Sequence, residues 1–217
     1  MSVVTTLEIQ KKNKERVNVY LDGEYAFSVD LMTAARLRKG QQLTDEEIAE
    51  LKEGDSLSRA VDRAVHFLAY RPRSIAEIRR TLAEKKTPED VIEAAIEHLS
   101  RLGYVDDEAF ANFWVENRST FKPLSPRALR YELRQKGVKD ADIEAALGDL
   151  DVTDAASRAA RSQVRAHRHK TRDVFRAKMS AFLQRRGFDF DVIRPVVEQL
   201  IAELEENDPE YFLSDEE

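Results

Sequence analysis

Five arginines between residues 158 and 172 carry the clearest chemical signal in the sequence: Arg158, Arg161, Arg165, Arg168 and Arg172. If this segment is one α-helix, their spacing of three or four residues places all five guanidinium groups on one face. Guanidinium groups bind phosphate and carboxylate oxygens through paired hydrogen bonds. The spacing therefore favours an anionic partner, either phosphate or an acidic protein surface, over a merely solvated helix face. Because such a stripe would be exposed, reversing Arg161, Arg165 and Arg168 to glutamate is expected to weaken binding without lowering thermal stability.

Charge is distributed unevenly along a chain whose net charge is −6. Residues 158–186 hold ten basic residues and one acidic residue, whereas residues 198–217 hold nine acidic residues and no basic one. A local basic surface can bind a polyanion even when the whole protein is acidic. The acidic end suggests a second hypothesis, that it shields the basic surface in the absence of a partner. Truncation after Glu206 should then raise DNA affinity at low salt.

Smaller basic clusters recur earlier in the chain, each around the middle helix of a predicted three-helix set. This arrangement resembles the helix-turn-helix plan, in which one helix enters the major groove of DNA. For any single cluster a solvated face is the more common explanation, but the recurrence favours one basic track. The predicted contacts with nucleic acid or an acidic partner are Arg71, Arg73, Arg79, Arg80, Arg127, Arg130, Arg134, Lys136, Arg158, Arg161, Arg165, Arg168, Arg172 and Arg176.

No residue set in the sequence is typical of a catalytic or metal site. The glycines are isolated, so there is no phosphate-binding loop, and there is no His-Glu-x-x-His motif. Asp106 and Asp107 precede a predicted helix, where a capping role is expected. His167 and His169 lie two residues apart on a predicted helix and so point to different faces. We predict a protein that is not an enzyme and that needs no metal or cofactor.

Composition also bounds the class of protein. The chain has no cysteine, which excludes disulfides, thiolate nucleophiles and zinc fingers. No apolar run approaches the roughly 18 residues that a membrane-spanning helix needs, and the first ten residues do not resemble a signal peptide. These features predict a cytoplasmic protein with no membrane association.

The first 55 residues are predicted to form a small β-rich module. Leu7–Lys12, Val17–Leu21 and Tyr25–Val29 alternate apolar and polar residues or resemble strands, and Asp22-Gly23 is typical of a two-residue hairpin turn. A helical stretch at 31–38 is expected to cover the sheet. Thr44 begins a capping box for a further short helix.

Beyond Ser56 the sequence indicates helices only. Ser74 begins a capping box, Thr87-Pro88 and Ser125-Pro126 place a hydroxyl before a proline, and later glycines mark helix ends. The predicted helices are 57–70, 74–85, 88–102, 106–119, 125–136, 139–149, 153–170, 173–186 and 189–206.

These helices form a repeat. A gapless shift of 51 residues superposes the apolar positions of the first set on the second, and a shift of 50 carries the second onto the third. The fold class is therefore predicted as mainly α, with three tandem helix-turn-helix-like repeats, elongated and curved, after the hairpin module. The predicted domains are 1–55 (β-rich module), 56–103, 104–150 and 151–206 (three-helix repeats) and 207–217 (acidic tail).

Several of these segments resemble the RecX family of bacterial RecA regulators. The resemblance rests on Phe67–Ser74 (FLAYRPRS), on Leu102–Ala111 (LGYVDDEAFA) about 30 residues later, and on Glu132–Val138 (ELRQKGV). It covers about residues 56–200, and the first module resembles the N-terminal extension of some members. Lys85-Lys86-Thr87 departs from the Lys-Gly turn common in the family.

The resemblance implies a non-enzymatic modulator of homologous recombination, DNA repair and the SOS response. Such proteins lodge in the groove of the RecA–DNA nucleoprotein filament and suppress ATP hydrolysis, strand exchange and coprotease action, and some bind single- or double-stranded DNA directly. A monomer is expected. The sequence has no dimerisation heptad, which argues against sequence-specific operator binding by a dimer with paired recognition helices. Two alternatives remain: a stand-alone helical DNA-binding protein, transcriptional or architectural, and a helical scaffold for another protein.

Overall fold

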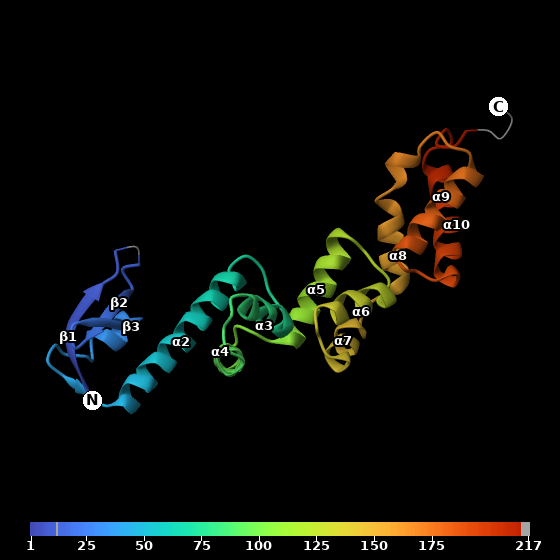
Figure 1. Cartoon of the computed structure of the whole chain (residues 1–217). Helices are drawn as coiled ribbons and strands as arrows, with labels where there is room; N and C mark the ends of the chain where they lie inside the picture. Colours follow the sequence, from blue (N-terminus) through green and yellow to red (C-terminus); the bar gives the residue numbers. More distant parts are fainter. Residues whose placement is uncertain (12, 214–217) are drawn as a thin grey trace. The chain divides into compact units, whose positions relative to one another are not determined.

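The computed structural model describes residues 1–11 and 13–213. The chain divides into two compact units, Met1–Val105 and Asp106–Glu217, which are considered separately. The first holds an antiparallel sheet and the first three-helix domain, and the second holds the other two three-helix domains (Figure 1). The predicted fold class, mainly α with a small N-terminal strand module, is confirmed.

The N-terminal sheet has four strands in the order β3-β2-β1-β4, all antiparallel. Asp22 and Gly23 both adopt positive φ angles, 52° and 94°, and form the predicted turn between β2 and β3. The first strand lies earlier than predicted, and β4 was missed. The elements are β1 (Ser2–Ile9), β2 (Arg16–Leu21), β3 (Glu24–Asp30), α1 (Leu31–Ala34) and β4 (Gln42–Leu43).

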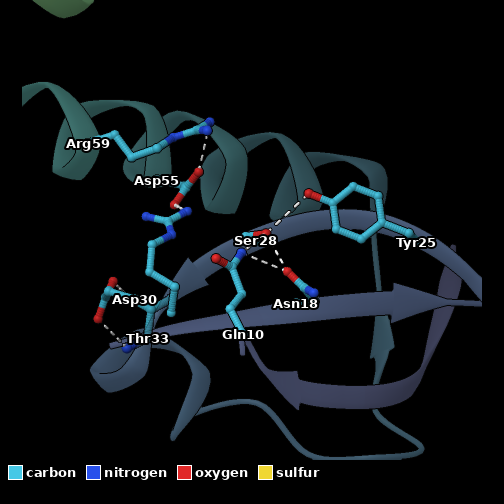
Figure 2. Close-up of polar contacts among 9 residues, drawn as sticks. Gln10, Asn18, Tyr25, Ser28, Asp30, Thr33, Asp55 and Arg59 are labelled. Atoms are coloured by element: carbon cyan, nitrogen blue, oxygen red, sulfur yellow. Dashed lines mark hydrogen bonds and ion pairs between the residues drawn. The ribbon is translucent and has the colours of Figure 1, made fainter. Parts of the chain in front are cut away.

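One face of this sheet is buried against helices, as its alternation predicted. Val17 and Val19 of β2 and Val29 of β3 pack with Leu37 and with Leu51 of the following helix. Helix α1 is shorter than the predicted 31–38, so the start of α2 supplies much of the cover. On β2 and β3 a small polar cluster joins Asn18, Ser28 and Tyr25 to Gln10 (Figure 2).

Helix α2 (Asp45–Leu68) is one continuous helix where the sequence predicted two. Thr44 forms the predicted capping box with Glu47. A glycine inside a helix costs only about 1 kcal/mol relative to alanine, so Gly54 does not end α2. The next residue, Asp55, is buried and forms an ion pair with Arg16 of β2. It forms another with Arg59 of α2 (Figure 2). The predicted boundary at residue 55 therefore lies inside a helix.

The first three-helix domain consists of the second half of α2, α3 (Ile75–Glu84) and α4 (Glu89–Arg101). Ser74 forms the predicted capping box with Glu77. The predicted Thr87 cap is wrong: the N-cap position of α4 is Pro88, which has no side-chain hydrogen bond to donate or accept.

The second domain consists of α5 (Asp107–Phe121), α6 (Pro126–Gln135) and α7 (Asp140–Leu147). Asp106 caps α5 by accepting hydrogen bonds from the Glu108 and Ala109 backbone N–H groups, the role predicted for it. The repeat is visible in the core, because residues related by the shifts of 51 and 50 are at most 1% exposed: Ile78, Leu82 and Ile92; Leu129, Leu133 and Ile143; Met179, Leu183 and Ile193.

The third domain departs from the sequence prediction. The predicted helix 153–170 ends early, so α8 (Val152–Arg161) is followed by a short 3₁₀ helix, η1 (Val164–His167). Two long helices complete the domain, α9 (Arg172–Arg185) and α10 (Phe190–Asn207). The segment predicted as an acidic tail continues this core, because Tyr211 is buried among its residues. Residues 214–217 of that predicted tail lie outside the described part of the chain.

A turn of the third domain packs against the second. The Ser125 N–H donates a hydrogen bond to the Arg186 carbonyl over 3.1 Å. Gly187 follows with φ +88°, and a Cβ there would lie 2.6 Å from the Ser125 hydroxyl oxygen. Glycine at this position therefore permits both the left-handed turn and the close approach.

Candidate nucleic-acid and filament interface

Among the predicted basic residues of the second domain, Arg130 and Arg134 form internal ion pairs. Arg130 of α6 binds both carboxylate oxygens of Glu144 in α7, at 2.6 and 2.8 Å. Arg134 donates to Asp140 over 2.8 Å. Arg127 differs, because it is exposed and forms no ion pair with any residue that the structure describes. Only Arg127 of these three therefore has its full charge available to an external anion.

Lys136 is also engaged within the domain. Its ammonium nitrogen lies 4.1 Å from the centroid of the Trp114 ring, and the Arg118 guanidinium lies 4.2 Å from that centroid. Glu132 accepts hydrogen bonds from Trp114 Nε1, over 2.8 Å, and from Arg118 Nε, over 2.7 Å. The cluster joins α5 to α6, so Lys136 has a structural role.

The first domain repeats the pairing between its middle and last helices. Arg79 of α3 binds both oxygens of Glu93 in α4, at 2.7 and 2.9 Å, and occupies the position that Arg130 has 51 residues later. Arg71 and Arg73 both lie near Glu77. Arg80, by contrast, is exposed and has no ion pair among the described residues.

The predicted stripe of five arginines on one helix is wrong. Helix α8 ends at Arg161, and the chain turns before η1, so the helical spacing stops there. Arg158 binds Asp154 of its own helix and donates to the Ser119 carbonyl over 3.0 Å. Four further ion pairs reach α10 or the residue just after it: Arg161–Glu203 (2.5 Å), Arg168–Asp208 (2.6 Å), Arg172–Glu205 and Arg176–Glu198 (2.6 Å).

The shielding hypothesis therefore needs a correction. Glu198, Glu203, Glu205 and Asp208 do face the arginines, but they do so as part of the folded third domain. Tyr211 donates a hydrogen bond to the Val164 carbonyl over 2.5 Å and anchors the segment after α10. Truncation after Glu206 would remove this anchor together with the charges. Point substitutions of the acids are the appropriate test.

Arg165 is left exposed by this arrangement. It lies on η1 and forms no ion pair with the described residues. The same hydrogen bond from Tyr211 to Val164 holds η1 in place, so a buried tyrosine positions an exposed cation. Of the predicted contacts, the structure thus leaves three outside internal ion pairs and ring contacts: Arg80, Arg127 and Arg165.

Sequence reasoning missed aromatic side chains that lie beside the basic ones. Tyr131 of α6 is 66% exposed, four residues after Arg127 and three before Arg134, and so shares a helix face with both. Tyr70 and Phe121, 51 residues apart, are 75% and 80% exposed. Exposed rings among cations are typical of surfaces that bind single-stranded nucleic acid. Spacing alone could have identified Tyr131, but not the exposure of the other two.

Acid should weaken the helix–helix ion pairs. Hydrogen bonds from Arg130 and Arg134 hold the pKa values of Glu144 and Asp140 below their ordinary values. A carboxylate whose folded pKa is depressed stabilises the fold above its unfolded pKa, about 4 for these residues, and this contribution is lost as the pH falls through the folded value. We expect the thermal unfolding midpoint to decrease once the pH is lowered below about 4.

In the variant Arg130→Gln/Glu144→Gln the thermal unfolding midpoint should decrease less steeply with falling pH. Equal slopes for the variant and the intact protein would contradict the assignment.

No group of three or more His, Asp or Glu side chains suited to a metal ion occurs among residues 1–11 and 13–213. Within the same residues, no helix is both long and apolar enough to cross a membrane.

Comparison with known proteins gives one consistent family along most of the chain. Family models match the regulatory protein RecX N-terminal domain at residues 2–44 and the first, second and third RecX three-helix domains at 60–99, 106–147 and 149–197. The N-terminal module, whose relation to the family rested on a weaker resemblance, is thus matched as well.

Curated relatives extend over nearly the full length. The chain is 36% identical to regulatory protein RecX of Bacillus velezensis, covering 96% of this chain and 80% of the relative. It is 34% identical to the Bacillus subtilis protein of the same name, covering 95% of this chain and 80% of that relative. A crystal structure of regulatory protein RecX superposes with a TM-score of 0.68 at 30% identity, covering 91% of this chain and all of that one. The chain therefore belongs to the RecX family of regulatory proteins.

Proposed function

We propose that this protein regulates the RecA recombinase, mainly as an inhibitor, by binding in the groove of the RecA–DNA filament. It modulates ATP hydrolysis, strand exchange and coprotease activity, and it contacts DNA directly as a cytoplasmic monomer. One observation supports the DNA contact: exposed arginines without an internal ion pair occur in both units, at Arg80, Arg127 and Arg165. Membership of a family of regulatory proteins supports the RecA partner.

The first test is the ATP hydrolysis of RecA on single-stranded DNA while the protein is added. Inhibition well below one copy per RecA subunit is expected, because a protein in the filament groove acts on the assembly. No effect on a cognate RecA would contradict the proposal. A salt-dependent gel shift would then test the alternative, a stand-alone DNA-binding protein.

The unpaired arginines predict a specific change in DNA binding. Arg127→Gln/Arg165→Gln should lower affinity and reduce the slope of log affinity against log salt, by about 0.9 per lost phosphate contact on duplex and about 0.7 on single strands. Stability should change by less than about 0.5 kcal/mol, because both side chains are exposed. Fluorescence anisotropy at several salt concentrations measures the slope.

A paired arginine offers the matched control. Arg130→Gln/Glu144→Gln removes an internal pair and leaves the net charge unchanged, so the salt slope should match that of the unmodified protein. An unchanged slope in the Arg127/Arg165 variant would contradict the assignment. Reversing Arg161 and Arg168 is a poorer test than the sequence suggested, because glutamate would face Glu203 and Asp208 and lower stability.

A further inference from the structure

An open hollow lies on the first three-helix domain, between α2 and α3. Its volume is about 390 Å³, within the range of small-molecule sites. Phe67 and Tyr70 supply rings, and the His66 ring meets Tyr70 edge to face at 5.5 Å. The complete lining is Asp62, Arg63, His66, Phe67, Tyr70, Thr81 and Lys85.

The second domain shows what fills the same place there. Lys85 and Lys136 are the C-cap residues of α3 and α6 and are related by the 51-residue repeat. At the position of Arg63 the second domain has Trp114, whose ring lies under the Lys136 ammonium at 4.1 Å. Glu132, at the position of Thr81, accepts the indole N–H. In the second domain, therefore, an indole from the chain itself occupies this place beneath the cation.

The third domain repeats the pairing of cation and ring. Arg186 is the C-cap of α9, and its guanidinium lies 4.9 Å from the centroid of the Phe182 ring. Lys85 of the first domain has no such ring among the described residues, and neither it nor Arg63 forms an ion pair with them. At the C-cap of the middle helix, the second and third domains therefore have a cation that lies over an aromatic ring, whereas the first domain has a cation without one.

The lining of the hollow suits a flat ring attached to negative charge. A ring would stack in the hollow beside Tyr70 and below Lys85, as the indole does in the second domain, since cations attract aromatic faces. Arg63 and Lys85 are exposed and have no ion pair among the described residues, and they outnumber the one carboxylate of the lining, Asp62, so they favour a ligand that carries negative charge. An unpaired nucleotide has both features, whereas a base in a duplex is stacked between its neighbours and cannot enter.

We propose that this hollow binds one unpaired base of single-stranded DNA. Tyr70 stacks on the base with His66 supporting its ring, and Arg63 and Lys85 contact the flanking phosphates. The proposal deepens the proposed function, on which it rests, by assigning a site for the DNA strand. Tyr70 is exposed and so has no packing role in the core, and base stacking gives this side chain a function.

The test separates base contacts from phosphate contacts. The full chain is titrated against an oligothymidylate and against the same oligonucleotide with abasic sites, which has equal charge. The intact protein should bind the base-bearing strand about 5- to 150-fold more tightly, the range expected for stacking of one base. Tyr70→Ala should lose this preference. Phe121→Ala is the matched control, since that ring is equally exposed but lies where Trp114 already fills the site, and it should keep the preference.

A second variant fills the hollow instead of emptying it. Arg63→Trp places an indole where the second domain has Trp114, so it should abolish the base preference while the thermal midpoint is unchanged or raised. Arg63→Gln controls for the lost charge and should weaken both oligonucleotides equally.

Three results would overturn the proposal. The first is equal affinity of the intact protein for the two oligonucleotides. The second is a preference for the base-bearing strand that survives Arg63→Trp. The third is a Tyr70→Ala variant that binds DNA normally but no longer inhibits RecA, which would assign the hollow to a protein contact. Failure of the proposed function itself is a different result, namely no inhibition of RecA by the intact protein.

Discussion

Replacing Asp55 by alanine is expected to destabilise the N-terminal unit by about 3–5 kcal/mol, the usual cost of removing one member of a buried ion pair. The Asp55 side chain is 3% exposed and lies 2.5 Å from Arg16 of the sheet and 3.0 Å from Arg59 of α2. Without the carboxylate, the Arg16 guanidinium stays largely buried with no counter-charge. Because this pair joins the sheet to the long helix, the loss should extend to both (Figure 2).

Amide hydrogen exchange measures this effect by region. Protection should fall in residues 2–30 and in α2, whereas residues of the second unit should exchange as before, since their cores are separate. Glu53→Gln is the matched control, because it removes an exposed carboxylate from the same helix turn. Arg16→Met/Asp55→Leu, which replaces both partners, should recover part of the loss. A change below about 1 kcal/mol for Asp55→Ala would contradict the assignment.

Replacing Tyr211 by alanine is expected to cost about 3–5 kcal/mol in the third domain, as removal of a large buried aromatic side chain does. The ring packs edge to face with Phe175 at 5.9 Å and with Phe212 at 4.7 Å. Burial raises the pKa of the Tyr211 hydroxyl, so it remains a hydrogen-bond donor to Val164 at neutral pH. Loss of this bond should release η1 and with it Arg165.

The variant Tyr211→Phe separates packing from hydrogen bonding. It keeps the ring and should cost only about 1 kcal/mol, the net value of one hydrogen bond. Truncation after Glu206 should behave like Tyr211→Ala, whereas truncation after Leu213 keeps the tyrosine and serves as the control. Chemical denaturation followed by far-UV circular dichroism, with amide hydrogen exchange of α8, α9 and α10, measures both. If truncation after Glu206 left stability intact and raised DNA affinity, the segment would be a detachable shield as first predicted.

The repeat and most helix boundaries can be predicted from the residues alone. Apolar positions at helical spacing, kept in register over shifts of 51 and 50 residues, predicted the core residues of all three domains, because burial imposes one periodicity on every amphipathic helix. The caps at Ser74 and Ser125 and the turn at Asp22-Gly23 followed from local side-chain and backbone chemistry. These features depend on neighbours a few residues away.

Which basic residues are available to a partner depends on contacts between helices, which the sequence did not predict. Arg130 and Arg127 look alike in the sequence, yet one binds Glu144 on another helix and the other is exposed. The five-arginine stripe was wrong for the same reason, since α8 ends at Arg161 and acids of α10 and of the residue after it bind Arg161, Arg168 and Arg172 across the domain. The hollow beside Tyr70 depends on one residue, Arg63, standing where Trp114 stands in the next domain. Ion pairs and cavities join residues distant in the chain, and periodicity carries no information about such contacts.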